Sequence, residues 1–344
     1  MNEPIRIAFI GSGNMARTHL LVMQSQHMTQ YRLRAVMDLD TKLATDRAAE
    51  FSADYHTTEL DRVLADPEID AVFICTRHDS HVDIGISAAR AGKHIFCEKP
   101  LAMNLPDCLR MEEVIRTTGV KLMMGFTQRF SEISRAAKEM VPAPSLTWGR
   151  FFGGRWPDDP DQPGSWLTDP IQGGGVLWGC GIHTADLVCW FNPSPPVEVF
   201  AFGSNNRHPT RGIIDTMTAT IRFADGAIGS LMFTDSGGFG LPDWTYELSG
   251  EGCGAFINTF MELWSTPADR SNLTGDKVEV KMRPWAWGLE KDYGSIQELE
   301  AFAEYILGDG PSPASVADGT RATAVVAKAI ESVRSGIPEK IDLG

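Results

Sequence analysis

The sequence predicts an α/β protein in two parts, which differ in how strand and helix signals follow one another. In the first 125 residues, short apolar runs alternate with helical periodicity, which indicates a mostly parallel sheet with helices on both faces. Beyond residue 125, strand-like runs follow one another more directly, as in antiparallel sheets. Glycines at positions 11 and 13 directly follow the first apolar run, so a tight turn joins the first strand to its helix.

The elements of the first part are predicted from their local patterns. Asp40 directly precedes a helical segment, and we expect its side chain to cap that helix. Strands are expected at 5–10, 33–37, 71–75, 94–97 and 120–124. Helices are expected at about 14–27, 41–51, 79–91 and 105–117.

The second part is expected to be rich in strands. Residues 224–226 (Ala-Asp-Gly) form a tight-turn signal, so the strands on either side should pair antiparallel. Strands are expected at 148–153, 198–202, 216–223, 226–233, 244–249 and 277–280. Helices are expected at about 129–139, 174–191, 295–307 and 313–335.

The composition excludes several classes of partner. Lys and Arg number 31 against 45 Asp and Glu, a net charge of −14 that disfavours binding to nucleic acid or to an anionic membrane. No apolar run approaches the roughly 18 residues of a membrane span, and residues 1–4 show no secretory signal, so we expect a cytoplasmic protein. Cysteines 75, 97, 108, 180, 189 and 253 form no CxxC pair and are expected to be thiols.

Residues 11–16 (Gly-Ser-Gly-Asn-Met-Ala) match a dinucleotide-binding fingerprint in its required place between a strand and a helix. Gly11 permits the tight turn, and Gly13 lets a pyrophosphate approach the backbone. Ala16 lets the helix and strand pack closely. The start of the helix then offers amide donors and a favourable dipole to the phosphates. We therefore expect a dinucleotide-binding domain.

Asp38 closes the second strand, where a carboxylate can accept both ribose hydroxyls of the adenosine. Leu39 follows it, so no cation is offered there to a 2′-phosphate, and NAD is favoured over NADP. The alternative is that Asp38 is only a turn residue beside Asp40.

Lys99, in residues 97–100 (Cys-Glu-Lys-Pro), lies just past the carboxyl end of a strand. Ligands of open α/β sheets bind outside these strand ends, so the Lys99 ammonium can lie beside a substrate oxygen. The alternative is a surface lysine in an ordinary loop.

Residues 75–81 follow the third main strand at the same sheet edge and can cover a cofactor. His78, Asp79 and His81 only superficially suggest a metal site, because no further ligand spacing supports one, and we expect no metal. Asp79 or Ser80 is instead expected to cap the next helix.

Three glycines, 173–175, precede a segment that carries His183 and Asp186. These two residues are three apart and therefore share a helix face. Since a histidine can exchange a proton near neutral pH, His183 is a candidate acid–base group. The alternative is a helix histidine with a structural role only.

Together these segments resemble the glucose–fructose oxidoreductase/inositol dehydrogenase (Gfo/Idh/MocA) family over nearly the whole chain. The resemblance depends on the order of the glycine motif, residues 88–102, residues 125–130, and the glycines that lead to His183. That order is specific for the family but not for a substrate. It implies a Rossmann domain at 1–125 and, at 126–344, an α/β domain with a large, mostly antiparallel open sheet. The helix at 314–335 can pack back on the first domain.

The resemblance also implies roles for individual residues. Lys99 corresponds to the family's active-site lysine, His183 to its catalytic histidine, and Trp166 to a tryptophan near the nicotinamide. The expected cofactor-binding residues are Gly11, Ser12, Gly13, Asn14, Met15, Asp38, Cys75, Thr76, His78, His81, Glu98, Lys99, Arg129 and Trp166. The expected substrate-binding residues are Lys99, Arg155, Trp156, Trp166 and His183.

One departure from the family pattern concerns position 179. The family often has an aspartate four residues before the histidine, where this chain has Gly179. A carboxylate there would orient the imidazole and raise its pKa. Without it, His183 must be oriented by another group, such as Asp186 or the substrate.

These observations predict an NAD-dependent dehydrogenase of a sugar, cyclitol or glycoside. The resemblance implies that it assembles as a homodimer or homotetramer through its second-domain sheet. Two alternatives remain: a redox-neutral enzyme that oxidises a sugar transiently, and a non-catalytic regulator that senses NAD. The loop at 155–166 is expected to line the substrate pocket, with a solvated acidic loop as the alternative.

Overall fold

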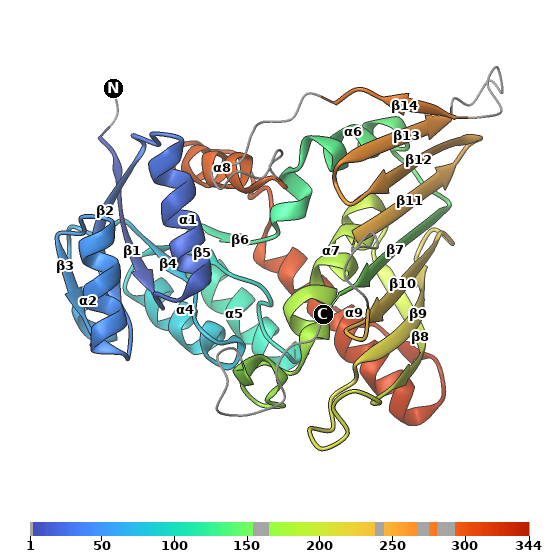
Figure 1. The fold of residues 1–344 in the computed structure, drawn as a ribbon, viewed down its shortest axis with the longest axis horizontal. Helices are drawn as coiled ribbons and strands as arrows, with labels where there is room; N and C mark the ends of the chain where they lie inside the picture. The colour runs from blue at the N-terminus through green and yellow to red at the C-terminus, as the bar shows by residue number, and fades with distance from the viewer. Residues whose placement is uncertain (1–2, 154–164, 238–243, 267–274, 281–292, 344) are drawn as a thin grey trace. The chain divides into compact units, whose positions relative to one another are not determined.

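The computed structural model describes residues 3–153, 165–237, 244–266, 275–280 and 293–343. The chain forms two compact units (Figure 1). The first unit consists of three segments, Met1–Ala102, Pro106–Thr127 and Pro284–Gly319. The second contains Met103–Leu105 and Gln128–Arg283, and it resumes at Thr320. The functional boundary expected between residues 125 and 126 stays a prediction.

The first unit has a six-stranded parallel sheet of order β3-β2-β1-β4-β5-β6, which confirms the Rossmann architecture. Its strands are β1 Ile5–Ile10, β2 Tyr31–Met37, β3 Tyr55–Thr57, β4 Ala71–Ile74, β5 His94–Cys97 and β6 Leu122–Met124. Its helices are α1 Asn14–Ser25, α2 Thr41–Glu50, α3 Leu60–Leu64, α4 His81–Arg90, α5 Leu105–Thr118 and α8 Ser295–Leu307. The chain order reverses between β1 and β4, which is where such folds bind ligands.

Stacked phenylalanines fill the core of this unit. Phe9, Phe73 and Phe96 come from the neighbouring strands β1, β4 and β5, and successive ring centroids are 4.7 and 4.8 Å apart. Phe302 of α8 meets two of these rings edge-on, at 5.3 and 5.4 Å. A helix from near the end of the chain therefore completes the core of the amino-terminal sheet.

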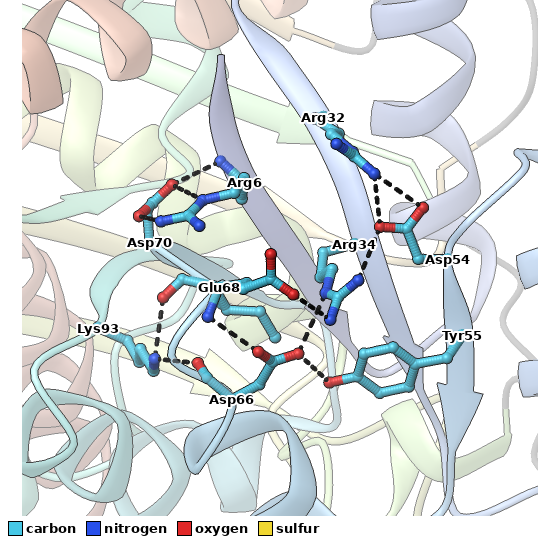
Figure 2. A network of polar contacts seen from close by, with 10 residues as sticks. Arg6, Arg32, Arg34, Asp54, Tyr55, Asp66, Glu68, Asp70 and Lys93 are labelled. Atoms are coloured by element: carbon cyan, nitrogen blue, oxygen red, sulfur yellow. Dashed lines mark hydrogen bonds and ion pairs between the residues drawn. The ribbon is translucent and has the colours of Figure 1, made fainter. Parts of the chain in front are cut away.

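Charged side chains at the amino-terminal ends of these strands form the network in Figure 2. Arg6 donates to both carboxylate oxygens of Asp70, and the Lys93 ammonium donates to the carbonyls of Asp66 and Ile69. The other labelled members are Arg32, Arg34, Asp54, Tyr55 and Glu68. Because ligands bind at the opposite, carboxyl ends of the strands, we assign this network a structural role.

The second unit has a nine-stranded sheet of order β14-β13-β12-β11-β7-β10-β9-β8-β15. Among the described strand pairs of this second sheet only β7 and β10 run parallel, so the expected mostly antiparallel sheet is confirmed. The strands are β7 Leu146–Phe152, β8 Pro196–Ser204, β9 Thr216–Phe223, β10 Ile228–Thr234, β11 Trp244–Gly250, β12 Cys253–Asn258, β13 Glu262–Thr266, β14 Asp276–Val278 and β15 Glu339–Lys340. The expected turn at 224–226 joins β9 to β10, with Gly226 at φ 91°.

Helices cover one face of this sheet (Figure 1): α6 Glu132–Met140, α7 Ile182–Phe191 and α9 Val316–Ser335. Gly149 of β7 permits a close approach of α7, because a Cβ there would lie 2.8 Å from the Thr184 methyl carbon. Along the described parts of the chain, no helix combines the length and apolar character that crossing a membrane requires. All six cysteines are reduced, and Cys97, Cys108 and Cys189 are buried.

Candidate active site

The glycine turn after β1 has the shape that a dinucleotide requires. Gly11 has a φ of 83°, and a Cβ there would lie 2.6 Å from the carbonyl oxygen of Cys75, so only glycine fits. A Cβ at Gly13 would meet no atom of the described chain within 4 Å, so the space above it is open. Helix α1 begins at the next residue, Asn14, so its first amides lie at this opening.

Asp38 at the end of β2 contacts the same turn. Its Oδ2 accepts hydrogen bonds from the backbone nitrogen of Ser12 at 2.7 Å and from the Ser12 hydroxyl at 3.0 Å. Each carboxylate oxygen can accept more than one bond, so Asp38 retains capacity for a ribose hydroxyl. Asp40 caps α2 as expected, by accepting from the amides of Lys42 and Leu43.

Two arginines near the glycine turn were not anticipated from the sequence. Arg47 of α2 donates from Nε to the Ser12 carbonyl at 3.1 Å. Its guanidinium also pairs with Glu50, which in turn pairs with Arg17 of α1. Hydrogen bonds from Arg17 and Arg47 lower the pKa of Glu50. A cation therefore does lie beside the turn, and a carboxylate neutralises part of its charge.

The turn after β5 places Lys99 at the carboxyl edge of the first sheet. The Glu98 amide donates to the Ile74 carbonyl at 3.0 Å, and the Lys99–Pro100 peptide is cis. Lys99 is half-buried, whereas Glu98 is buried and its Oε1 lies 2.7 Å from Nε2 of His19 on α1. His19 was missed by sequence reasoning, because nothing local to α1 identifies its partner.

Residues 75–81 lie at the same edge, as expected, with His78 and His81 buried. Nδ1 of His81 lies 2.7 Å from the Pro100 carbonyl oxygen, and burial lowers the pKa of its imidazole. The expected helix cap is wrong in its chemistry: Ser80 occupies the N-cap position, but its hydroxyl donates to Thr76 and to the Arg77 carbonyl instead. The residues that the structure describes contain no cluster of His, Cys, Asp or Glu suited to a metal ion.

His183 lies in the second unit, in the first turn of α7. A π-helical turn, Leu177–Gly181, leads into this helix. Such turns occur frequently at functional sites. The His183 ring meets Trp244 edge-on at 5.8 Å, and Trp244 packs on Phe151 at 4.3 Å. Trp244 was predicted only as the start of a strand, and its contact with His183 becomes visible only in the fold.

The backbone around Gly179 is not the regular helix that was expected at 174–191. Gly179 lies inside the π-helical turn, so its four-residue spacing to His183 is not the regular α-helical one. A Cβ at this position would lie 2.8 Å from Cδ1 of Leu167. The space into which an aspartate side chain would extend is therefore bordered closely by an apolar side chain.

Asp186, offered above as a group that could orient His183, is buried and bound by another partner. Arg129 donates to both of its carboxylate oxygens. The binding role expected for Arg129 stays a prediction. Trp166 is half-buried in a 3-10 turn, Ser165–Thr168, whereas Arg155, Trp156 and the acidic residues 158, 159 and 161 lie outside the described residues.

Two models of one protein family match successive parts of the chain. The "oxidoreductase family, NAD-binding Rossmann fold" model matches residues 5–126, and the Gfo/Idh/MocA C-terminal domain model matches residues 136–254. The chain belongs to the Gfo/Idh/MocA oxidoreductase family.

Relatives within this family are similar to the chain over nearly its whole length. Myo-inositol 2-dehydrogenase of Thermotoga maritima is 26% identical over 96% of this chain and 98% of its own. The NAD(+)-dependent scyllo-inositol 2-dehydrogenase of Bacillus subtilis is 26% identical over 100% and 98%. A solved structure of levoglucosan dehydrogenase with NADH and L-sorbose shares the fold, with a TM-score of 0.87 and 24% identity over 99% of this chain and 100% of that one.

Proposed function

We propose that this protein is an NAD-dependent oxidoreductase that moves a hydride between the nicotinamide and a carbinol carbon of a sugar, cyclitol or glycoside. The observation that carries the proposal is the carboxyl edge of the first sheet, where the open glycine turn follows β1, Asp38 follows β2 and Lys99 follows β5. The inositol and levoglucosan dehydrogenases among its relatives support a polyhydroxylated substrate.

The turn residues fit a dinucleotide. The amides at the start of α1 would hold the pyrophosphate above Gly13, and Asp38 would accept a ribose hydroxyl. Pairing of Arg47 with Glu50 leaves less positive charge for a 2′-phosphate, which supports NAD over NADP. When bound, the nicotinamide supplies the carbon that accepts or returns the hydride.

In the proposed reaction, Lys99 and His183 are the groups of the chain that act on the substrate hydroxyl. The neutral His183 imidazole would take the proton of the substrate hydroxyl. The Lys99 ammonium would stabilise the alkoxide that develops as this proton leaves. Trp166 and Arg129, with Arg155 and Trp156, would line the substrate and nicotinamide sites.

The test is a screen of sugars, cyclitols and glycosides for accumulation of NADH. We expect Lys99→Met and His183→Asn to lower turnover by about 10² to 10⁴-fold, the usual contribution of a positioned acid–base group. Lys42→Met is the matched control, because that ammonium pairs with Asp46 on the surface. Full turnover by Lys99→Met would contradict the proposal. Substrate conversion without net NADH would favour the redox-neutral alternative, and NAD binding without any turnover would favour a regulator.

We also propose that the face of the second sheet that no described helix covers (Figure 1) contacts a second copy of the chain. Paired positions across seven strands form one row on this face. In order, the row is Phe200, Thr220, Ser230, Trp148, Glu247, Phe256 and Trp264. Phe202, which is 73% exposed, lies two residues from one end of the row. Aromatic side chains on an exposed face favour an interface.

Sedimentation velocity tests this assembly. We expect the wild type to form a dimer or tetramer, and the double variant Phe202→Glu, Trp264→Glu to be a monomer. Leu307→Glu, an equally drastic change at an exposed position of α8, should leave the assembly intact. A monomeric wild-type protein would exclude this role for the face.

A further inference from the structure

We infer that two buried histidines, His19 of α1 and His81 of α4, are positioning residues that fix the turn carrying Lys99. His19 contacts the residue before Lys99, and His81 contacts the residue after it. The inference rests on the proposed role of Lys99 in the reaction.

His19 fixes the side chain of Glu98. The His19 ring is 2% exposed and packs against Phe96 and Phe73, at centroid distances of 5.2 and 6.1 Å. Its Nε2 lies 2.7 Å from Oε1 of Glu98, which is itself 4% exposed. A buried carboxylate is costly without a partner, so this contact favours one orientation of Glu98.

The space around Glu98 is closed on a further side by Gly125. A Cβ at this glycine would lie 3.3 Å from the carboxyl carbon of Glu98. The backbone is held as well, because the Gly125 amide donates to the Cys97 carbonyl at 2.8 Å. Glu98 therefore extends toward α1 and anchors the first half of the turn.

His81 fixes the second half of the turn. Its ring is 1% exposed, with Nδ1 2.7 Å from the Pro100 carbonyl oxygen and Nε2 3.2 Å from the Thr76 carbonyl oxygen. A neutral imidazole carries one N–H, and the shorter distance assigns it to Nδ1. His81 thus joins the segment after β4 to the segment after β5.

These contacts fix the position of the Lys99 Cα. Its neighbours Glu98 and Pro100 are each bound by a buried imidazole, so the backbone on both sides of the half-buried Lys99 is held. A misplacement of about 1 Å at a reacting group can cost about 10²-fold in rate. Loss of either histidine should therefore lower kcat far more than it changes substrate or NAD binding.

The experiment compares variants that remove each contact with variants that keep it. His19→Met and His81→Leu fill the space without donating. His19→Gln and His81→Asn retain an N–H close to the position of Nε2 and Nδ1, respectively. We expect the apolar variants to lose about 10- to 100-fold in kcat, with KM and the Kd for NAD changed only several-fold, and the amide variants to recover most of kcat.

His94→Ala is the matched control, because His94 lies at the other end of β5, where its Nδ1 accepts from the Lys121 amide. It should lower Tm without lowering kcat. An equal loss of kcat in His94→Ala would overturn the inference, since any disturbance of β5 would then suffice. If His19→Met fails to fold, the His81 pair carries the same comparison.

A double variant separates this inference from the proposed function. In the Lys99→Met background, His19→Met should cause little further loss, because both changes act through the same ammonium. Wild-type kcat in Lys99→Met would refute the proposed function itself. An inactive Lys99→Met beside fully active His19→Met and His81→Leu would overturn only the positioning role.

Discussion

Arg129 donates two hydrogen bonds to Asp186, from Nε to Oδ2 at 2.8 Å and from Nη2 to Oδ1 at 2.5 Å. The two side chains are 3% and 2% exposed. The pair joins the 3-10 turn Thr127–Phe130 to α7, the helix that carries His183. The carboxylate of Asp186 therefore ties α7 to this turn, and both of its oxygens accept from Arg129.

Removing one member of the Arg129–Asp186 pair should lower the free energy of unfolding more than removing both members. Arg129→Met leaves a buried carboxylate, and we expect it to lower the free energy of unfolding by about 3 to 5 kcal/mol. Arg129→Met with Asp186→Leu should recover much of that loss. Chemical denaturation of the two single variants and the double variant measures the coupling, and strictly additive effects would contradict it.

Asp38→Ala should weaken NAD more than NADP, because only a free 2′-hydroxyl can donate to the carboxylate. The change also removes the acceptor for the Ser12 amide, so both dissociation constants should rise to some extent. Titration of NAD and NADP against the wild type and Asp38→Ala gives the ratio of the two dissociation constants for each protein. A wild type that prefers NADP would refute the assignment.

Glu50→Gln should shift the cofactor preference toward NADP. The carboxylate of Glu50 pairs with both Arg17 and Arg47, and the latter contacts the glycine turn. Removal of its charge leaves the two guanidiniums to attract a 2′-phosphate. We expect tighter NADP binding with NAD nearly unchanged. Glu113→Gln, which breaks a surface pair with Arg116, is the control.

Acid should destabilise the first unit through the network in Figure 2. Burial raises the pKa of Asp70, but hydrogen bonds from Arg6 outweigh it and leave the pKa lowered. A carboxyl with a lowered pKa contributes stability above its unfolded value of about 3.9, and this is lost as pH falls through the folded pKa. Unfolding of wild type and Asp70→Asn across this range should show a smaller pH dependence in the variant.

Local signals predicted most of the first unit. The glycine turn and the Asp40 cap depend on residues next to each other in sequence, and both were found where the pattern placed them. Strand β3 and helix α3 were missed, because three and five residues are too few to show a period. In the second unit, β13 and β15 were missed because they have only five and two residues. Strand β12 was also missed, although it has six residues and follows a tight turn at Glu251 and Gly252.

The parts of the site that escaped prediction depend on contacts between distant residues. His19 lies 79 residues from Glu98, and Arg47 lies 35 residues from Ser12. Nothing in the sequence around a helix histidine or arginine shows what it meets after folding. The π-helical turn at Gly179 was likewise invisible, because its sequence reads as ordinary helix.

The position of α8 has a consequence for biosynthesis. Phe302 completes the aromatic core between β4 and β5, and the Tyr31 hydroxyl donates to the Leu299 carbonyl at 2.5 Å. The ribosome must therefore synthesise the chain through α8 before the parallel sheet of the first unit can close its own core. Until then the rings of Phe73 and Phe96 lack their cover, which is the kind of exposed apolar surface that chaperones bind and that promotes aggregation.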